Sequence, residues 1–123
     1  MNLSAGRFWF KQREDPMTIE MIKELTDKEF EFAVSNGLNI VLFYKEKCPY
    51  CNAMKKILTK FSGMPAAQGK AITYFQMNRE NCPQTVADLN VGRIPSLFIF
   101  KDGEKTAERS GDVTYRQLEK MVV

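Results

Sequence analysis

Two cysteines, Cys48 and Cys51, stand three positions apart in the stretch Lys-Cys-Pro-Tyr-Cys-Asn. Cysteines at this spacing can open and close a disulfide, bind a metal ion, or remain buried thiols. The chain contains no histidine, which excludes Cys–His catalytic pairs and zinc sites that need a histidine ligand. Nucleophilic chemistry in this stretch must therefore depend on the two thiols themselves.

Pro49 indicates how the two cysteines lie on a helix. Proline is favoured in the first turn of a helix, because its missing N–H has no partner to lose there. We therefore expect Cys48 at or just before the helix start, and Cys51 one turn inside on the same face. The free N–H groups of the helix start and the nearby charge of Lys47 favour a Cys48 thiolate. This pattern predicts Cys48 as the nucleophile and the more shielded Cys51 as the thiol that resolves a mixed disulfide.

Two other interpretations of the pair remain open. In one, Cys48 and Cys51 bind zinc or an iron–sulfur cluster, with Cys82 as a third ligand and a carboxylate, a water or a second chain completing the site. In the other, the pair is two inert buried thiols. Cys82 precedes Pro83 in a predicted loop and is interpreted as an ordinary thiol, with a regulatory mixed disulfide as the alternative.

The elements that must position the cysteines alternate between strand and helix patterns. Strands are predicted at residues 19–25, 38–44, 71–77, 96–100 and 105–109. Helices are predicted from the capping box at 26–29 to the glycine at 37, from the cysteine pair to 62–63, at 85–89, and after the capping box at 114–117. Asp102-Gly103 predicts a hairpin turn. The order β-α-β-α-β-α-β-β-α implies an α/β fold with a mixed sheet flanked by helices.

Composition limits the classes of function. The chain has 123 residues, of which 44% are hydrophobic and 27% charged, as in a soluble domain with one core. A net charge of +3 is too small to predict nucleic-acid binding. No apolar run reaches the roughly 18 residues that cross a bilayer, and no signal-peptide pattern is found. We therefore expect a cytoplasmic protein without membrane contact, where close cysteine pairs tend to be catalytic or metal-binding.

The sequence divides into an N-terminal extension, residues 1–18, and a domain, residues 19–123. Phe8, Trp9 and Phe10 lie between charged residues in the extension. We interpret the extension as a loosely ordered arm. The alternative is that these aromatic side chains dock on the domain or on a partner, because exposed clusters of aromatic residues are unusual.

Over residues 19–123 the chain resembles the thioredoxin-like superfamily. The resemblance rests on the strand–Cys-Pro-Tyr-Cys–helix unit, the segment VGRIPSLFIF at 91–100, Asp-Gly-Glu at 102–104, and Gly111. It implies a thioredoxin-like fold, a cis Ile94–Pro95 bond, and a dithiol–disulfide oxidoreductase that needs no cofactor or metal. It also implies that Ile94 and Pro95 hold an extended substrate segment against the cysteines.

The same resemblance indicates the partners. These are disulfide-containing proteins as substrates and either a reductase or glutathione as electron donor, with the chain acting as a monomer. Pro49 and Tyr50 are expected to contact substrate, although Tyr50 could instead pack on the helix end. A thioredoxin-fold binding module with little turnover and a glutathione-dependent enzyme remain as alternatives.

The chain departs from the usual thioredoxin pattern in two ways. Pro-Tyr between the cysteines is the glutaredoxin dipeptide, and Leu42 and Gln76 occupy the places of the aspartate and lysine that form a proton relay in thioredoxins. The glutaredoxin glutathione site also has Thr-Val-Pro and Gly-Gly, where this chain has Arg93-Ile94-Pro95 and Ser110-Gly111. We interpret the chain as a thioredoxin scaffold with a glutaredoxin-type pair. This predicts a potential nearer to roughly −200 to −230 mV than to −270 mV, and a Cys48 thiol that titrates below about 8.5.

Overall fold

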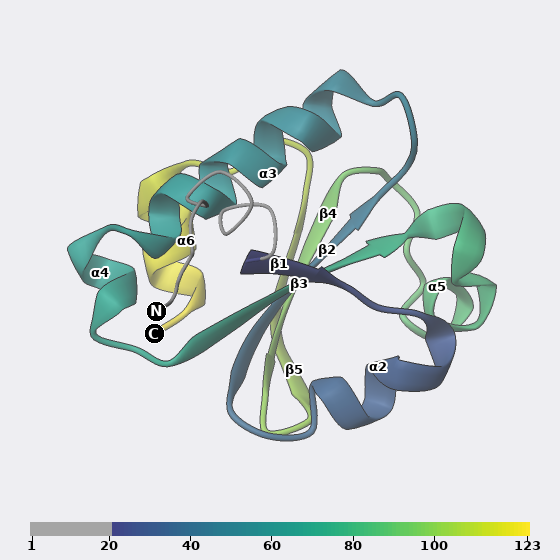
Figure 1. The fold of residues 1–123 in the computed structure, drawn as a ribbon, viewed down its shortest axis with the longest axis horizontal. Coiled ribbons are helices and arrows are strands. Elements are labelled where there is room, and N and C mark those ends of the chain that lie inside the picture. Colours follow the sequence, from purple (N-terminus) through teal and green to yellow (C-terminus); the bar gives the residue numbers. More distant parts are fainter. Residues whose placement is uncertain (1–20) are drawn as a thin grey trace, which may run out of the picture.

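The computed structural model describes residues 21–123, which form a five-stranded sheet with helices on both faces (Figure 1). The strand order is β1-β3-β2-β4-β5. The strands are β1 (Ile22–Glu24), β2 (Leu38–Tyr44), β3 (Ile72–Asn78), β4 (Ser96–Lys101) and β5 (Glu104–Ser110). The helices are α2 (Asp27–Ala33), α3 (Pro49–Ser62), α4 (Pro65–Gln68), the 3-10 helix η1 (Arg79–Asn81), α5 (Pro83–Asp88) and α6 (Tyr115–Met121).

The sheet is mixed, as predicted. β3 pairs in parallel with both β1 and β2, whereas β4 runs antiparallel to β2 and to β5. Figure 1 shows α3, α4 and α6 on one face of the sheet and α2 and α5 on the other. This arrangement confirms the predicted α/β fold with helices flanking a mixed sheet.

Strand β2 forms the centre of the core because both of its faces are buried. Ile40 and Leu42 point into the cluster beneath α3 and α6, while Val41 and Phe43 point into the cluster beneath α2 and α5. All four side chains are fully shielded from solvent. A strand that must be apolar on both faces appears in the sequence as a continuous apolar run, and this explains why β2 was predictable.

Capping and turn residues set the boundaries of several elements. The Thr114 side chain accepts the Gln117 N–H at 3.1 Å, and the Gln117 side chain accepts the Thr114 N–H at 2.9 Å, so the predicted capping box is confirmed. The hairpin between β4 and β5 turns at Asp102 and Gly103, which have φ values of 50° and 90°. Asp102 also accepts the Gly37 N–H through its carboxylate, at 2.8 Å.

Some boundaries differ from the predictions. Within the described residues the first strand covers only Ile22–Glu24, and α2 ends at Ala33, before the predicted stop at Gly37. The predicted helix at 85–89 begins earlier, at Pro83, because proline is favoured at the first helical position. The short α4, which begins at Pro65 in the same way, was not predicted. The predicted extension, residues 1–18, lies outside the described residues.

Candidate active site

Cys48 caps the start of α3, as Pro49 predicted. The Cys48 backbone is extended, with φ −115° and ψ 105°, and Pro49 is the first helical residue. The chain reaches this point from Tyr44, the last residue of β2, through the exposed residues 45–47. Lys47 has a φ of 55°, so the chain turns sharply there before the helix begins. The pair therefore lies at the carboxyl end of a buried strand, where α/β proteins commonly place their chemistry.

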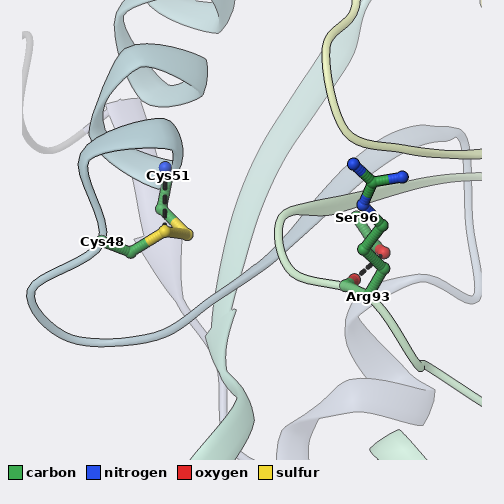
Figure 2. The surroundings of a disulfide bond; sticks show 4 residues. All are labelled: Cys48, Cys51, Arg93 and Ser96. Atoms are coloured by element: carbon green, nitrogen blue, oxygen red, sulfur yellow. Dashed lines mark hydrogen bonds between the residues drawn. A yellow bond between two sulfur atoms is a disulfide. The ribbon is translucent and has the colours of Figure 1, made fainter.

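Cys48 and Cys51 form a disulfide across the first turn of α3, shown in Figure 2. Their Cα atoms are 5.2 Å apart, a distance typical of disulfides. The Cys48 Sγ accepts the Cys51 N–H at 3.2 Å, so the free N–H groups of the helix start act on this sulfur. Cys48 is 6% exposed and Cys51 is 0% exposed. Cys48 is therefore the more accessible residue of the two.

A groove of 270 Å³ adjoins the pair, and its lining includes three of the predicted substrate contacts. Its lining residues are Tyr50, Arg93, Ile94, Pro95, Gly111 and Asp112. The Ile94–Pro95 peptide bond is cis, as the resemblance implied. Tyr50 is 71% exposed, so it extends into solvent and does not pack on the helix end. The fourth predicted contact, Pro49, is exposed at the start of α3 but does not line the groove.

Hydrogen bonds join two of the chain segments that line the groove. The Gly111 N–H donates to the Pro95 carbonyl at 2.9 Å, and the hydroxyls of Ser96 and Ser110 lie 3.1 Å apart. The Ser96 hydroxyl also donates to the Arg93 carbonyl, as Figure 2 shows. Gly111 has a φ of 80°, a conformation that glycine adopts without strain. These bonds hold the loop before β4 against the end of β5.

The face of the sheet beneath the pair has an apolar residue where thioredoxins have an aspartate. Leu42 is fully buried in the same cluster as both cysteines, and Gln76 is its partner on β3. The Gln76 side chain turns toward Glu24 on β1 and donates a hydrogen bond to its carboxylate at 2.8 Å. The position beneath the pair therefore offers no carboxylate that could receive a proton from Cys51.

Tyr44 joins this polar network from the end of β2. Its hydroxyl donates to the Glu24 carboxylate at 2.8 Å, and the Lys55 Nζ lies 3.8 Å from the centre of its ring. Burial and, secondly, the Glu24 carboxylate raise the pKa of Tyr44 well above its ordinary value. The tyrosine is therefore a neutral hydrogen-bond donor at physiological pH.

Cys82 lies on the other side of the sheet from the pair. It belongs to the cluster beneath α2 and α5, whereas Cys48 and Cys51 belong to the cluster beneath α3 and α6. It is fully buried, and its Sγ donates to the Leu25 carbonyl at 3.6 Å. This position contradicts a metal site shared by the three cysteines. Within residues 21–123 there is no group of three or more side chains that could hold a metal ion.

Arg93, Gly111 and Asp112 line the groove but were not predicted from the sequence to do so. Gly111 and Asp112 follow β5 and lie 16 or more positions beyond Pro95, so no local pattern connects them with the cysteines. Arg93 stands two residues before the cis proline, and this closeness in sequence was the one signal that could have placed it in the groove.

None of the helices in residues 21–123 is long and apolar enough to cross a membrane.

Comparisons with known proteins agree with the fold and the cysteine pair. The sequence model of the thioredoxin family matches residues 21–123. A thioredoxin of Listeria monocytogenes is 33% identical over 84 residues, which cover 68% of this chain and 79% of the relative. A thioredoxin of Rhodospirillum rubrum is 34% identical over 92 residues, covering 73% of this chain and 86% of the relative. The structure is similar to oxidised mitochondrial thioredoxin 3 of Saccharomyces cerevisiae, with a TM-score of 0.71 and 22% identity over 85% of this chain and 96% of that chain.

Proposed function

We propose specific roles for the two cysteines on the premise that this chain belongs to the thioredoxin family. It is a thiol–disulfide oxidoreductase that acts on disulfide-containing proteins and is reduced by a reductase. Cys48 is the nucleophile, and Cys51 is the resolving thiol. The observation that supports this assignment is the position of the Cys48 sulfur. It caps α3 and accepts the Cys51 N–H, and Cys48 is the more exposed residue of the two.

The catalytic cycle exchanges one disulfide for another. In the reduced protein the Cys48 thiolate attacks one sulfur of the substrate disulfide, that S–S bond breaks, and the other substrate sulfur leaves as a thiolate that takes a proton. Cys51 then loses its proton and attacks the Cys48 sulfur, which releases the second substrate thiol. The protein ends with the Cys48–Cys51 disulfide of this structure, and two electrons have passed to the substrate.

Water takes the Cys51 proton in this proposal. The support is Leu42, which is fully buried beneath the pair and has no group that accepts a proton. Gln76, its neighbour on β3, is an amide that does not titrate and is engaged with Glu24. Resolution by Cys51 therefore has no internal base at this position, and its rate should rise with pH as water and hydroxide take up the proton.

The groove beside the pair holds the substrate. Ile94, Pro95 and the exposed Tyr50 line it, and Tyr50 stands two residues after Cys48 in the chain. An extended substrate segment that lies along Ile94 brings its disulfide to the Cys48 sulfur, which is the use that thioredoxin-like proteins make of this proline. Pro49 sets the start of α3 and contacts the substrate beside Tyr50.

We further propose that the electron donor is a thioredoxin-type reductase and not glutathione. Ser110-Gly111 occupies the place of the Gly-Gly pair of the glutaredoxin glutathione site, and the Ser110 hydroxyl is engaged with Ser96.

We also propose that the protein is a cytoplasmic monomer that binds neither nucleic acid nor membrane, as its net charge of +3 and its likeness to bacterial thioredoxins support. Analytical ultracentrifugation of the full chain in both redox states tests whether the protein is a monomer.

Insulin reduction tests the assignment of the two cysteines. The full chain is assayed with NADPH and thioredoxin reductase, and separately with glutathione and glutathione reductase. Cys48→Ser should abolish turnover, Cys51→Ser should stop after one mixed disulfide, and Cys82→Ser serves as the matched control. Full activity of Cys48→Ser would overturn the assignment, and equal turnover with the two donors would overturn the choice of donor.

A further inference from the structure

Arg93 places a positive charge in the groove where the substrate binds. Its side chain extends from the loop before β4 toward the chain that follows β5, as Figure 2 shows. A Cβ atom on Gly111 would lie only 3.7 Å from the Arg93 Cζ, so the guanidinium lies directly against the Gly111 backbone. The bond from the Gly111 N–H to the Pro95 carbonyl keeps the two segments together.

The guanidinium has no ionic partner in the part of the chain that the structure describes. The single ion pair among residues 21–123 joins Lys105 and Glu108 on β5. Asp112 lines the same groove but forms no ion pair with Arg93. Arginine carries five N–H donors in a planar fork that fits a carboxylate. Arg93 is exposed, and no ion pair within residues 21–123 occupies these donors.

Two of the three charged residues in the turn before Cys48 have the same sign as Arg93. Lys45 and Lys47 are exposed in the turn that leads to Cys48. Glu46, between them, accepts a hydrogen bond from the Asn78 side chain at 3.2 Å and is therefore directed toward the end of β3. Positive charge thus lies in the turn before α3 and, with Arg93, in the lining of the groove, which also contains Asp112.

We propose that Arg93 is a specificity residue, and that the groove selects protein disulfides with an aspartate or glutamate next to the cysteine that Cys48 attacks. The carboxylate pairs with the Arg93 guanidinium while the substrate backbone lies along Ile94. This proposal rests on the proposed function, because it assumes attack by Cys48 with the substrate in this groove. It adds no chemical step to the exchange described above.

Three matched peptide disulfides test the proposal. Each is a homodimer of the same short peptide, and the residue beside the cysteine is Glu, Gln or Lys. The full chain reduces them with dithiothreitol as electron source, and kcat/KM is measured at low and high salt. The variants are Arg93→Gln, Arg93→Glu and, as matched control, Lys101→Gln, which removes the same charge at the far end of β4.

The wild type should prefer the Glu peptide over the Gln peptide by about two- to fivefold at low salt, the range expected for an exposed ion pair. Salt should reduce this preference because it screens exposed charges. Arg93→Gln should abolish it, Arg93→Glu should favour the Lys peptide, and Lys101→Gln should keep it. Equal wild-type rates on the three peptides would overturn the proposal while leaving the proposed function intact, whereas an active Cys48→Ser would overturn the proposed function itself.

Two further outcomes count against the proposal. If Arg93→Gln slows the three peptides by the same factor, the arginine supports the loop and does not select substrates. Glutathione disulfide, which carries carboxylates on a small tripeptide, is assayed as a fourth substrate. If Arg93→Gln slows only this substrate, the guanidinium serves glutathione and the assignment to acidic protein segments is wrong.

Discussion

Two helices of this protein begin with cysteine followed by proline, yet their cysteines have opposite surroundings. Cys48-Pro49 starts α3, and Cys82-Pro83 starts α5. The Cys48 sulfur accepts a backbone N–H, has Cys51 one turn away and adjoins a groove. The Cys82 sulfur is buried in an apolar cluster and donates to a carbonyl. A cysteine at a helix start is therefore not reactive by that position alone.

The electrostatic surroundings of the two thiols also differ. Burial and then the carboxylates of Asp27 and Glu24 raise the pKa of Cys82. By contrast, the charges in the turn before Cys48 include two exposed lysines, Lys45 and Lys47. The comparison teaches that access and nearby positive charge, and not a backbone hydrogen-bond donor alone, favour a nucleophilic thiol. Cys82 is fully buried, and a backbone hydrogen bond from Asp27 lowers its pKa less than burial and the two carboxylates raise it.

The largest effect that this comparison predicts is in alkylation rate. In the reduced full chain at pH 7, iodoacetamide should label Cys48 at least about 100-fold faster than Cys82, because the Cys82 thiol is neutral and inaccessible. Mass spectrometry of proteolytic peptides gives the two rates. In denaturant the rates should become similar. Comparable rates in the folded protein would show that α5 opens readily and that the contrast between the helix starts is wrong.

A second prediction concerns stability. Cys82→Ser should lower the free energy of unfolding by about 1–3 kcal/mol, because it places a hydroxyl in an apolar cluster in place of a weakly polar thiol. Denaturant unfolding of the oxidised protein measures the change with the Cys48–Cys51 disulfide intact. The rate of insulin reduction should stay within about twofold of the wild-type rate, since Cys82 lies on the other face of the sheet from the cysteine pair. A variant that loses activity while still folded would assign Cys82 a part in turnover.

The third prediction is the pH dependence of that stability. The folded pKa of Cys82 is raised above its ordinary value of 9.0, so the folded state keeps the proton that the unfolded state loses. The stabilisation is complete below about pH 9 and is lost as the pH rises toward the folded pKa. Unfolding of the oxidised wild type should therefore become easier across this range, and Cys82→Ala should show a shallower decline. Identical pH slopes in the two proteins would contradict the burial effect.

The two helix starts also show what could be predicted from the sequence. Local rules were sufficient to predict the position of Cys48 at the start of a helix. Pro49 marks the first helical residue, and the strand before it is apolar on both faces. The same local rule applied to Pro83, and Cys82 lies between η1 and α5 as predicted, but its burial was not predicted. Its burial depends on α5 packing against α2, where the Asp27 carboxylate accepts the N–H of Thr85 at 2.9 Å. No sequence pattern near Cys82 predicts this long-range contact between α5 and α2.

The groove was predictable only in part for the same reason. Resemblance to a family supplied the cis bond at Ile94–Pro95, which composition and spacing could not show. The position of Arg93 against Gly111 depends on the β4–β5 hairpin, which brings together residues that are far apart in sequence. Leu42 and Gln76, which the resemblance assigned to the places of the relay residues, are partners in the parallel pairing of β2 and β3. The direction of the Gln76 side chain, toward Glu24, required the structure.

The smallest predicted effect isolates the charge beside Cys48. Lys47 is exposed in the turn before α3, and its charge stabilises the Cys48 thiolate and hence the reduced protein. Lys47→Gln should therefore make the potential more negative by about 10 mV, since an exposed charge contributes less than about 1 kcal/mol and 30 mV corresponds to about 1.4 kcal/mol. Equilibration with glutathione mixtures measures the potential, for which we expect roughly −200 to −230 mV in the wild type. Lys101→Gln removes a charge at the far end of the sheet and should leave the potential unchanged. Equal shifts in the two variants, or a shift to a less negative value in Lys47→Gln, would show that the charges in this turn do not distinguish Cys48 from Cys82.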